Sequence, residues 1–172
     1  PLWDLPQAAL TRLPKPARLA TLCEVAARAY DAPCAANIAA APGTQILLPQ
    51  VMRLVPPGRA VVLSPTYAEH ARTAALVGHG VHETSRFDDL AAADLAVVVN
   101  PNNPDGRVLS RAALLDLAAK LRRKGGLLVV DEAFMDVGPT KESLAGDVAA
   151  GGIVVLKSFG KFFGLAGLRL GF

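Results

Sequence analysis

The sequence predicts an α/β fold in which helices cover both faces of a mostly parallel sheet. The first observation is a series of short, uninterrupted apolar runs, which are typical of strands buried on both faces. The second is that segments with helical spacing alternate with these runs, as βαβ units require. The third is that 172 residues with 52% hydrophobic content suffice for one domain with a buried core.

The N-terminal part is expected to contain an arm followed by two helices. Residues 1–16 carry four prolines, which exclude one regular element, so we predict an extended arm there and a single domain over residues 17–172. A helix over residues 18–30 follows from apolar residues that recur on one face at helical spacing. A second helix is predicted over residues 46–55, where Pro49 indicates a kink or a later start.

Beyond the second helix, strands and helices alternate. Helices are predicted over residues 68–77 and 110–121, and Ser110 is the expected N-cap of the latter. The predicted strands cover residues 60–63, 81–84, 95–99, 127–130 and 153–156. In sheets of this kind ligands bind outside the carboxyl ends of the strands, so the residues that follow each strand are the candidates for a site.

Four segments with chemically active side chains follow strand ends, at residues 64–67, 100–106, 131–134 and 158–161. Each has an ordinary structural explanation, because asparagine and proline favour turns, Asp131 would cap a helix, and a lone lysine is normally solvated. Together, however, Tyr67, Asn103, Asp131 and Lys161 offer a ring-stacking group, an amide, a carboxylate and an amine to one crevice. A lysine just beyond a buried strand, with a hydroxyl and a guanidinium nearby, is suited to hold an aldehyde covalently and to bind an anion.

A candidate anion site lies at the start of the second helix. Gly43, Thr44 and Gln45 precede its apolar part, where unpaired amides and the helix dipole favour negative charge. These residues alone leave open the alternative that Thr44 is only an N-cap.

Composition and charge argue against several other classes of function. The net charge of +3 is modest, and its densest cluster (Arg122, Arg123 and Lys124) ends a predicted helix, where cations complement the dipole, so we expect no nucleic-acid partner. Cys23 and Cys34 match no metal-ligand spacing, so we predict no metal and two reduced thiols. No apolar run reaches the roughly 18 residues of a membrane span, and the first ten residues lack the pattern of a signal peptide. We therefore expect a cytoplasmic protein with no membrane partner.

Three motifs are jointly specific: Asn103-Pro104-Asp105-Gly106, Asp131-Glu132-Ala133, and Ser158-x-x-Lys161 followed by Arg169. With them the chain resembles, over nearly its whole length, the fold-type I, pyridoxal-phosphate-dependent aminotransferase class I/II superfamily. The resemblance implies that pyridoxal 5'-phosphate is the cofactor, that Lys161 binds its aldehyde and then carries protons as the catalytic residue, and that Asp131 pairs with the ring nitrogen. The remaining cofactor contacts that it implies come from Gly43, Thr44, Gln45, Ser158 and Arg169 at the phosphate, Asn103 at the phenolic oxygen, and Tyr67 and Ala133 on the two ring faces.

Within that superfamily, residues 131–136 and 158–167 look most like threonine-phosphate decarboxylases of cobalamin biosynthesis. Those enzymes convert L-threonine O-3-phosphate to (R)-1-amino-2-propanol O-2-phosphate and CO₂. Histidinol-phosphate aminotransferases share almost every motif and are the first alternative; a non-catalytic, cofactor-binding domain is the second. The resemblance also implies a phosphorylated amino-acid substrate and a homodimer.

The chain departs from the pattern of its relatives in three ways. Leu13 stands where many have a tyrosine that reaches the partner subunit's cofactor phosphate. Phe134 stands where most have a tyrosine that helps to hold the phenolic oxygen. Relatives also continue past the position of Phe172 into a smaller domain that grips the substrate carboxylate. The resemblance therefore implies a large domain whose C-terminal partner domain is missing.

Overall fold

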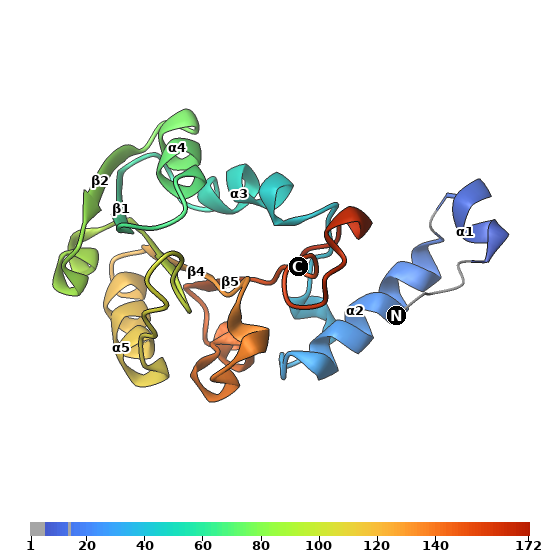
Figure 1. The fold of residues 1–172 in the computed structure, drawn as a ribbon. Helices are drawn as coiled ribbons and strands as arrows, with labels where there is room; N and C mark the ends of the chain where they lie inside the picture. The colour runs from blue at the N-terminus through green and yellow to red at the C-terminus, as the bar shows by residue number, and fades with distance from the viewer. Residues whose placement is uncertain (1–5, 14) are drawn as a thin grey trace.

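The computed structural model describes residues 6–13 and 15–172, and its centre is a five-stranded sheet (Figure 1). The strand order is β2-β1-β3-β4-β5, and every neighbouring pair is parallel. The helices are α1 (Gln7–Thr11), α2 (Pro16–Ala29), α3 (Thr44–Met52), α4 (Glu69–Leu76) and α5 (Arg111–Arg122). The strands are β1 (Arg59–Leu63), β2 (Gly80–Thr84), β3 (Leu95–Val99), β4 (Leu127–Asp131) and β5 (Ile153–Leu156).

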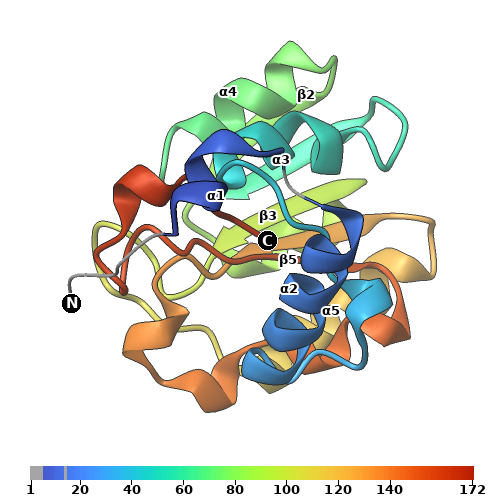
Figure 2. The same cartoon turned by 90° about the vertical axis from the view of Figure 1, so that its right-hand side faces the viewer.

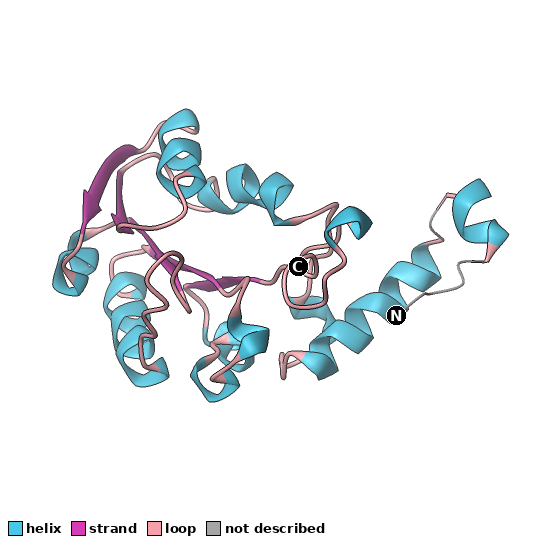
Figure 3. Ribbon diagram, viewed as in Figure 1, coloured by secondary structure: helices cyan, strands magenta, loops and turns pink. Residues whose placement is uncertain are grey.

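Helices cover both faces of the sheet, as predicted (Figure 3). Successive strand residues point to opposite faces, so the valines of one strand divide between two cores. On one face Val98 and Val130 pack with the apolar side of α5, and on the other Val97 and Val129 pack with α3 and α4. All five residues of β3 and of β4 are buried, which explains why these strands read as unbroken apolar runs.

Two helices begin earlier than the sequence predicts, and proline accounts for one of them. Helix α2 starts at Pro16, because the first helical position needs no amide hydrogen and suits the fixed φ of proline. Helix α3 starts at Thr44 and ends at Met52, and Pro49 lies inside it. The prediction of Ser110 as a cap is confirmed, since its hydroxyl accepts a hydrogen bond from the amide of Ala113 at 3.3 Å.

The prediction of an extended N-terminal arm is wrong for part of its length. Residues Gln7–Thr11 form the short helix α1, which Pro6 precedes and an extended Arg12 follows. The prolines at 6 and 16 flank helices here and do not interrupt them. Figure 1 shows α1 and the start of α2 extending away from the sheet. Residues 1–5 and 14 of the predicted arm lie outside the described part of the chain.

The chain between β4 and β5, residues 132–152, was not assigned an element from the sequence. It contains three short 3-10 helices, Met135–Val137, Thr140–Glu142 and Ala145–Ala150. The chain then passes through β5 and returns, so that Phe172 pairs with Lys157 through two backbone hydrogen bonds of 2.8 and 2.9 Å (Figure 2). The end of the described chain therefore lies beside β5.

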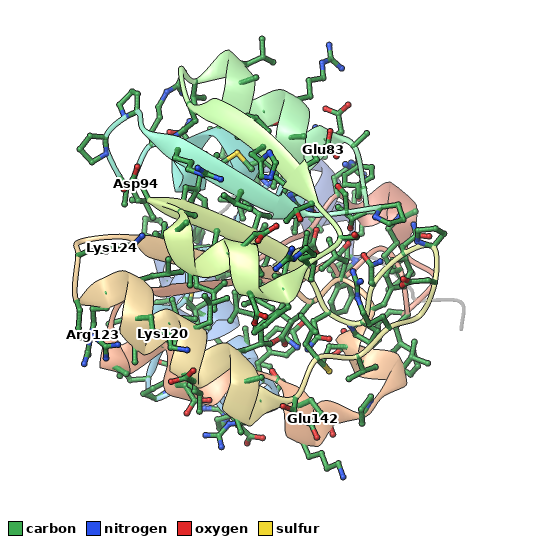
Figure 4. The ribbon with its side chains drawn as sticks, turned by 90° about the vertical axis from the view of Figure 1, so that its left-hand side faces the viewer. Glu83, Asp94, Lys120, Arg123, Lys124 and Glu142 are labelled. Carbon is green, nitrogen blue, oxygen red and sulfur yellow. The ribbon has the colours of Figure 1, made fainter. Side chains whose placement is uncertain are left out.

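Surface features agree with the sequence where they can be compared. Figure 4 shows Lys120, Arg123 and Lys124 at the C-terminal end of α5, and the Lys124 ammonium donates to the carbonyl of Ala91 at 2.9 Å. The basic cluster therefore ends a helix, as expected. Within residues 6–13 and 15–172, the helices are too short or too polar to cross a membrane.

Candidate functional site

A cavity of about 380 Å³ opens at the carboxyl ends of the central strands. The structure brings all ten predicted site residues to its wall, although they come from segments up to 126 residues apart (169 minus 43). The contribution of each to binding stays a prediction. These wall residues are Gly43, Thr44, Gln45, Tyr67, Asn103, Asp131, Ala133, Ser158, Lys161 and Arg169.

One end of the cavity is suited to bind an anion. Gly43 is the N-cap of α3 with φ of 90°, and the helix points its first amides at the cavity. A Cβ atom on Gly43 would lie 2.9 Å from Nη2 of Arg169, so a larger residue would displace this guanidinium. Arg169 itself has a left-handed φ of 52°. The first amides of α3, the helix dipole and a guanidinium therefore converge on one spot, as a phosphate requires. The amide of Gly43 itself donates to the carbonyl of Ala41 at 2.6 Å.

Gly171 holds this anion end together, and sequence reasoning missed it. It forms isolated antiparallel bridges with Ala41 on one side and Ser158 on the other. A Cβ atom on Gly171 would lie 2.5 Å from the backbone nitrogen of Thr44. Its close approach to α3 brings Ser158 and Arg169 toward the helix start. A glycine at position 171 is only a weak sequence signal for this contact, because Thr44 is far away in the sequence.

Asp131 lies at the end of β4 and is held by two contacts. Its Oδ1 accepts a hydrogen bond from the amide of Ala133 at 3.0 Å. Its Oδ2 lies 2.9 Å from Nε2 of His70, a fully buried residue of α4 that the sequence analysis did not single out. The carboxylate is thus oriented before any ligand binds, and its free lone pairs are available to the cavity.

Tyr67 is connected to the anion end through a short hydrogen-bond chain. Its hydroxyl donates to Oε1 of Gln45 at 3.2 Å, and the Gln45 amide donates to Oε2 of Glu69 at 3.0 Å. The Tyr67 ring contacts His70 edge-on, with ring centroids 5.7 Å apart. Tyr67 as a whole remains 46% exposed and lines the cavity, so its ring is accessible for stacking.

Asn103 is positioned by its neighbour Asn102, which sequence reasoning also missed. The buried Asn102 amide donates to Pro65 O at 3.0 Å and to Oδ1 of Asp105 at 2.8 Å, and its oxygen accepts from the Thr66 hydroxyl at 2.7 Å. This one side chain therefore ties the loop after β3 to the loop that carries Tyr67. The amide of Arg107 and the side chain of Asn102 donate to Asp105 and lower the pKa of its carboxyl.

Lys161 and Phe134 face each other across the cavity. The lysine is exposed, and its Nζ lies 5.7 Å from the centroid of the Phe134 ring. At this distance the ring face attracts the ammonium group. Ala133 is buried beside Asp131 and leaves space where a larger side chain would enter the cavity.

Comparison with known proteins gives a consistent result. Residues 12–172 match the family model described as aminotransferase class I and II. A threonine-phosphate decarboxylase of Pseudomonas aeruginosa is 46% identical over 171 residues, covering 98% of this chain and 50% of that protein. One of Sinorhizobium sp is 50% identical over 134 residues, covering 76% of this chain and 40% of that protein. The chain therefore spans about half, or less, of the length of these relatives.

Among solved structures, a histidinol-phosphate aminotransferase of Sinorhizobium meliloti was crystallised in complex with pyridoxal-5'-phosphate. It is 28% identical to this chain, with a TM-score of 0.75. The match covers 96% of this chain and 49% of that structure. The α/β fold is thus shared with an enzyme that binds this cofactor.

Proposed function

Because this chain belongs to the aminotransferase class I and II family, whose enzymes use pyridoxal 5'-phosphate, we propose that its protein decarboxylates L-threonine O-3-phosphate. The products are (R)-1-amino-2-propanol O-2-phosphate and CO₂, and the expected setting is cobalamin biosynthesis. The observation that carries the proposal is the 46% identity to a threonine-phosphate decarboxylase across 98% of the chain. Sequence similarity of this extent favours a shared substrate, whereas fold alone does not.

The residues of the cavity fit the cofactor. Gly43 leaves space that an added Cβ would fill, directly beside the Arg169 guanidinium, which suits a phosphate group. Asp131 presents a pre-oriented carboxylate for a protonated ring nitrogen. Lys161 supplies the amine that binds an aldehyde, and Tyr67 offers an accessible ring. These residues would hold the group at its phosphate, nitrogen, aldehyde and ring.

When bound, pyridoxal 5'-phosphate supplies an electron sink for charge that develops at the substrate α-carbon. Asp131 would keep a proton on the ring nitrogen, because its carboxylate favours the cationic form. In the proposed reaction the bond between the α-carbon and the carboxyl carbon breaks, and CO₂ leaves without that electron pair. The Nζ of Lys161 would then deliver a proton to the α-carbon, where a C–H bond replaces the lost bond.

Two alternatives remain, and each has its own observation. Transamination of histidinol phosphate is supported by the Sinorhizobium meliloti structure, which is 28% identical. The bond held perpendicular to the cofactor ring decides between the two reactions, because that bond overlaps with the electron sink. A non-catalytic cofactor-binding role is supported by the cavity itself, because its residues fit the cofactor without defining a substrate site.

The deciding experiment supplies the complete gene product and cofactor with threonine phosphate labelled at the carboxyl carbon. We expect labelled CO₂ without any added 2-oxo acid. Lys161→Ala should abolish the release, and Lys141→Ala, at an exposed lysine outside the cavity, should not change it. Amino-group transfer to a 2-oxo acid without CO₂ would establish the transaminase, and cofactor binding without turnover of either substrate would establish the binding role.

We also propose that two copies of the protein associate. The support is an exposed aromatic cluster beside the cavity: Phe162 is 54% exposed and Phe163 41% exposed. The ring of Phe163 stacks on that of Phe159, with ring centroids 4.4 Å apart, and meets the ring of Phe162 edge-on, with centroids 5.2 Å apart. The three rings therefore form one apolar patch. Exposed patches of this kind are typical of association surfaces. Light scattering should give the mass of a dimer, and Phe162→Ser should lower it; a monomeric natural protein would contradict the proposal.

A further inference from the structure

A buried ion pair joins the two strand ends that carry the site. Nζ of Lys157 lies 2.7 Å from Oε2 of Glu132, and their side chains are 6% and 0% exposed. Glu132 directly follows Asp131, and Lys157 directly precedes Ser158. Adjacent residues on an extended chain point to opposite sides, so the pair lies behind the wall from which Asp131 and Ser158 face the cavity.

Every contact of this pair ties one strand end to another segment. Glu132 accepts a hydrogen bond from the Ser143 hydroxyl at 2.6 Å and from the Leu144 amide at 2.8 Å, and its own amide donates to Leu156 O at 2.9 Å. Lys157 also lies with its ammonium 5.0 Å from the ring centroid of Tyr30. The ends of β4 and β5 are therefore clamped to each other and to the chain between them.

Stability alone does not explain a buried pair in this place. Removing two charges from water is costly, and apolar residues of similar volume often stabilise a protein equally well or better. A hydrogen-bonded pair does have one property that apolar side chains lack, because its directional contacts permit only one relative arrangement of the two ends. Here that arrangement sets the spacing between Asp131 and the segment that holds Ser158 and Lys161.

The cofactor of this family is a rigid ring that must reach Asp131 at one position and Lys161 at another. A misplacement of about 1 Å between binding groups can cost roughly a hundredfold in function. We propose that Glu132 and Lys157 are positioning residues, which hold the ring-nitrogen carboxylate and the cofactor-binding lysine segment at the spacing the cofactor requires. This inference rests on the cofactor and not on the proposed reaction.

The test separates positioning from stability by removing both charges together. Glu132→Gln combined with Lys157→Met keeps an acceptor for Leu144 and removes both charges of the pair, so its melting temperature should fall far less than that of a variant that leaves Glu132 unpaired. The Asp136 carboxylate, which also loses a nearby cation, is only partly buried. We expect its dissociation constant for pyridoxal 5'-phosphate, measured by absorbance titration, to rise about tenfold or more. The single variant Lys157→Arg retains a cation for Glu132, so it should bind the cofactor with most of the affinity that the double variant loses.

Lys120→Met on the surface of α5 is the matched control. It also removes the lysine of an ion pair, here with Asp116, but the Lys120 side chain is 49% exposed. It should change neither the melting temperature nor the affinity. If the double variant does not fold, Glu132→Gln carries the test, because Lys157 then keeps the Asp136 carboxylate and the Tyr30 ring as partners; the expected loss of affinity is about threefold or more. Unchanged cofactor affinity in the folded variant would overturn the inference. Failure of the natural protein to bind the cofactor would instead count against the proposed function.

Discussion

His70 and Asp131 form a buried contact in which Nε2 of the histidine lies 2.9 Å from Oδ2 of the aspartate. The side chains are 0% and 11% exposed. Among residues 6–13 and 15–172, Nδ1 of His70 has no hydrogen-bond partner, so the contact to Asp131 is the one polar interaction that this ring makes there. His70 therefore serves the orientation of the carboxylate.

Replacing His70 with phenylalanine should weaken cofactor binding. The substitution keeps a buried ring of similar shape but leaves Oδ2 of Asp131 without its donor. Because hydrogen bonds to charged groups contribute about 1.5–3 kcal/mol, we expect affinity for pyridoxal 5'-phosphate to fall roughly 10- to 100-fold. Fluorescence or absorbance titration measures this effect.

His79 provides a control for that prediction. It is also buried, but its ring nitrogens contact the amide of Gly58 at 3.2 Å and the carbonyl of Met52 at 2.8 Å, outside the cavity. His79→Phe should lower the melting temperature and leave cofactor affinity in the folded protein unchanged. Equal losses of affinity in both variants would show that His70 acts only through stability.

Gly43→Ala should remove the anion site. An added Cβ would lie 2.9 Å from the Arg169 guanidinium at a φ of 90°, so either the backbone or the arginine must move. We expect cofactor affinity to fall about tenfold or more, since the phosphate loses a charge-assisted contact. Gly151→Ala has a similar φ of 78° but nothing within 4 Å, so it tests backbone strain alone and should spare binding.

Asn102→Asp should disrupt the loop that carries Asn103. The Asn102 amide needs its nitrogen as a donor, because this nitrogen donates hydrogen bonds to Pro65 O and to Asp105. A carboxylate at this place would face two acceptors and lose both bonds, with an expected cost of about 2–4 kcal/mol in the free energy of unfolding. Chemical denaturation measures this cost, and Asn37→Asp, at an exposed position, should change it little. Stability equal to that of the natural protein would contradict the assigned orientation of the Asn102 amide.

Asp136→Asn should stabilise the protein at neutral pH and not in acid. Burial raises the pKa of the Asp136 carboxyl, and the ammonium of Lys157 opposes this shift. A raised pKa means that the folded state favours the protonated carboxyl. The stabilisation that the protonated carboxyl gives is therefore present below the usual pKa of about 3.9, and it is lost as the pH rises through the pKa of Asp136 in the folded state. The partial exposure of Asp136 to water limits the gain to about 1–2 °C in melting temperature. A gain that grew toward acid pH would contradict this sign.

Local pattern was sufficient for the strands and for the residues that face the cavity. The runs at 95–99 and 153–156 were predicted to the residue, because each is an unbroken apolar run with a polar residue or glycine on either side. Tyr67, Asn103, Asp131 and Lys161 could be proposed because their segments follow strand ends, and parallel strands bring those ends to one edge. The cofactor contacts of the other candidate residues were implied by the family resemblance. Proline misled the prediction at the start of α2, and Pro49 does not mark the later start that was one of its two interpretations, because it lies inside α3.

The sequence by itself thus determined the α/β fold and the edge that carries the cavity, since these follow from periodicity and from strand polarity. The full set of groups that line the cavity followed from the family resemblance. Only the tertiary structure decided which polar groups support them. His70 meets Asp131 across 61 residues, Thr66 meets Asn102 across 36, and Lys157 meets the buried carboxylate of Glu132. A polar residue is stable in the interior only when its partner arrives there with it, and that pairing depends on how distant segments pack.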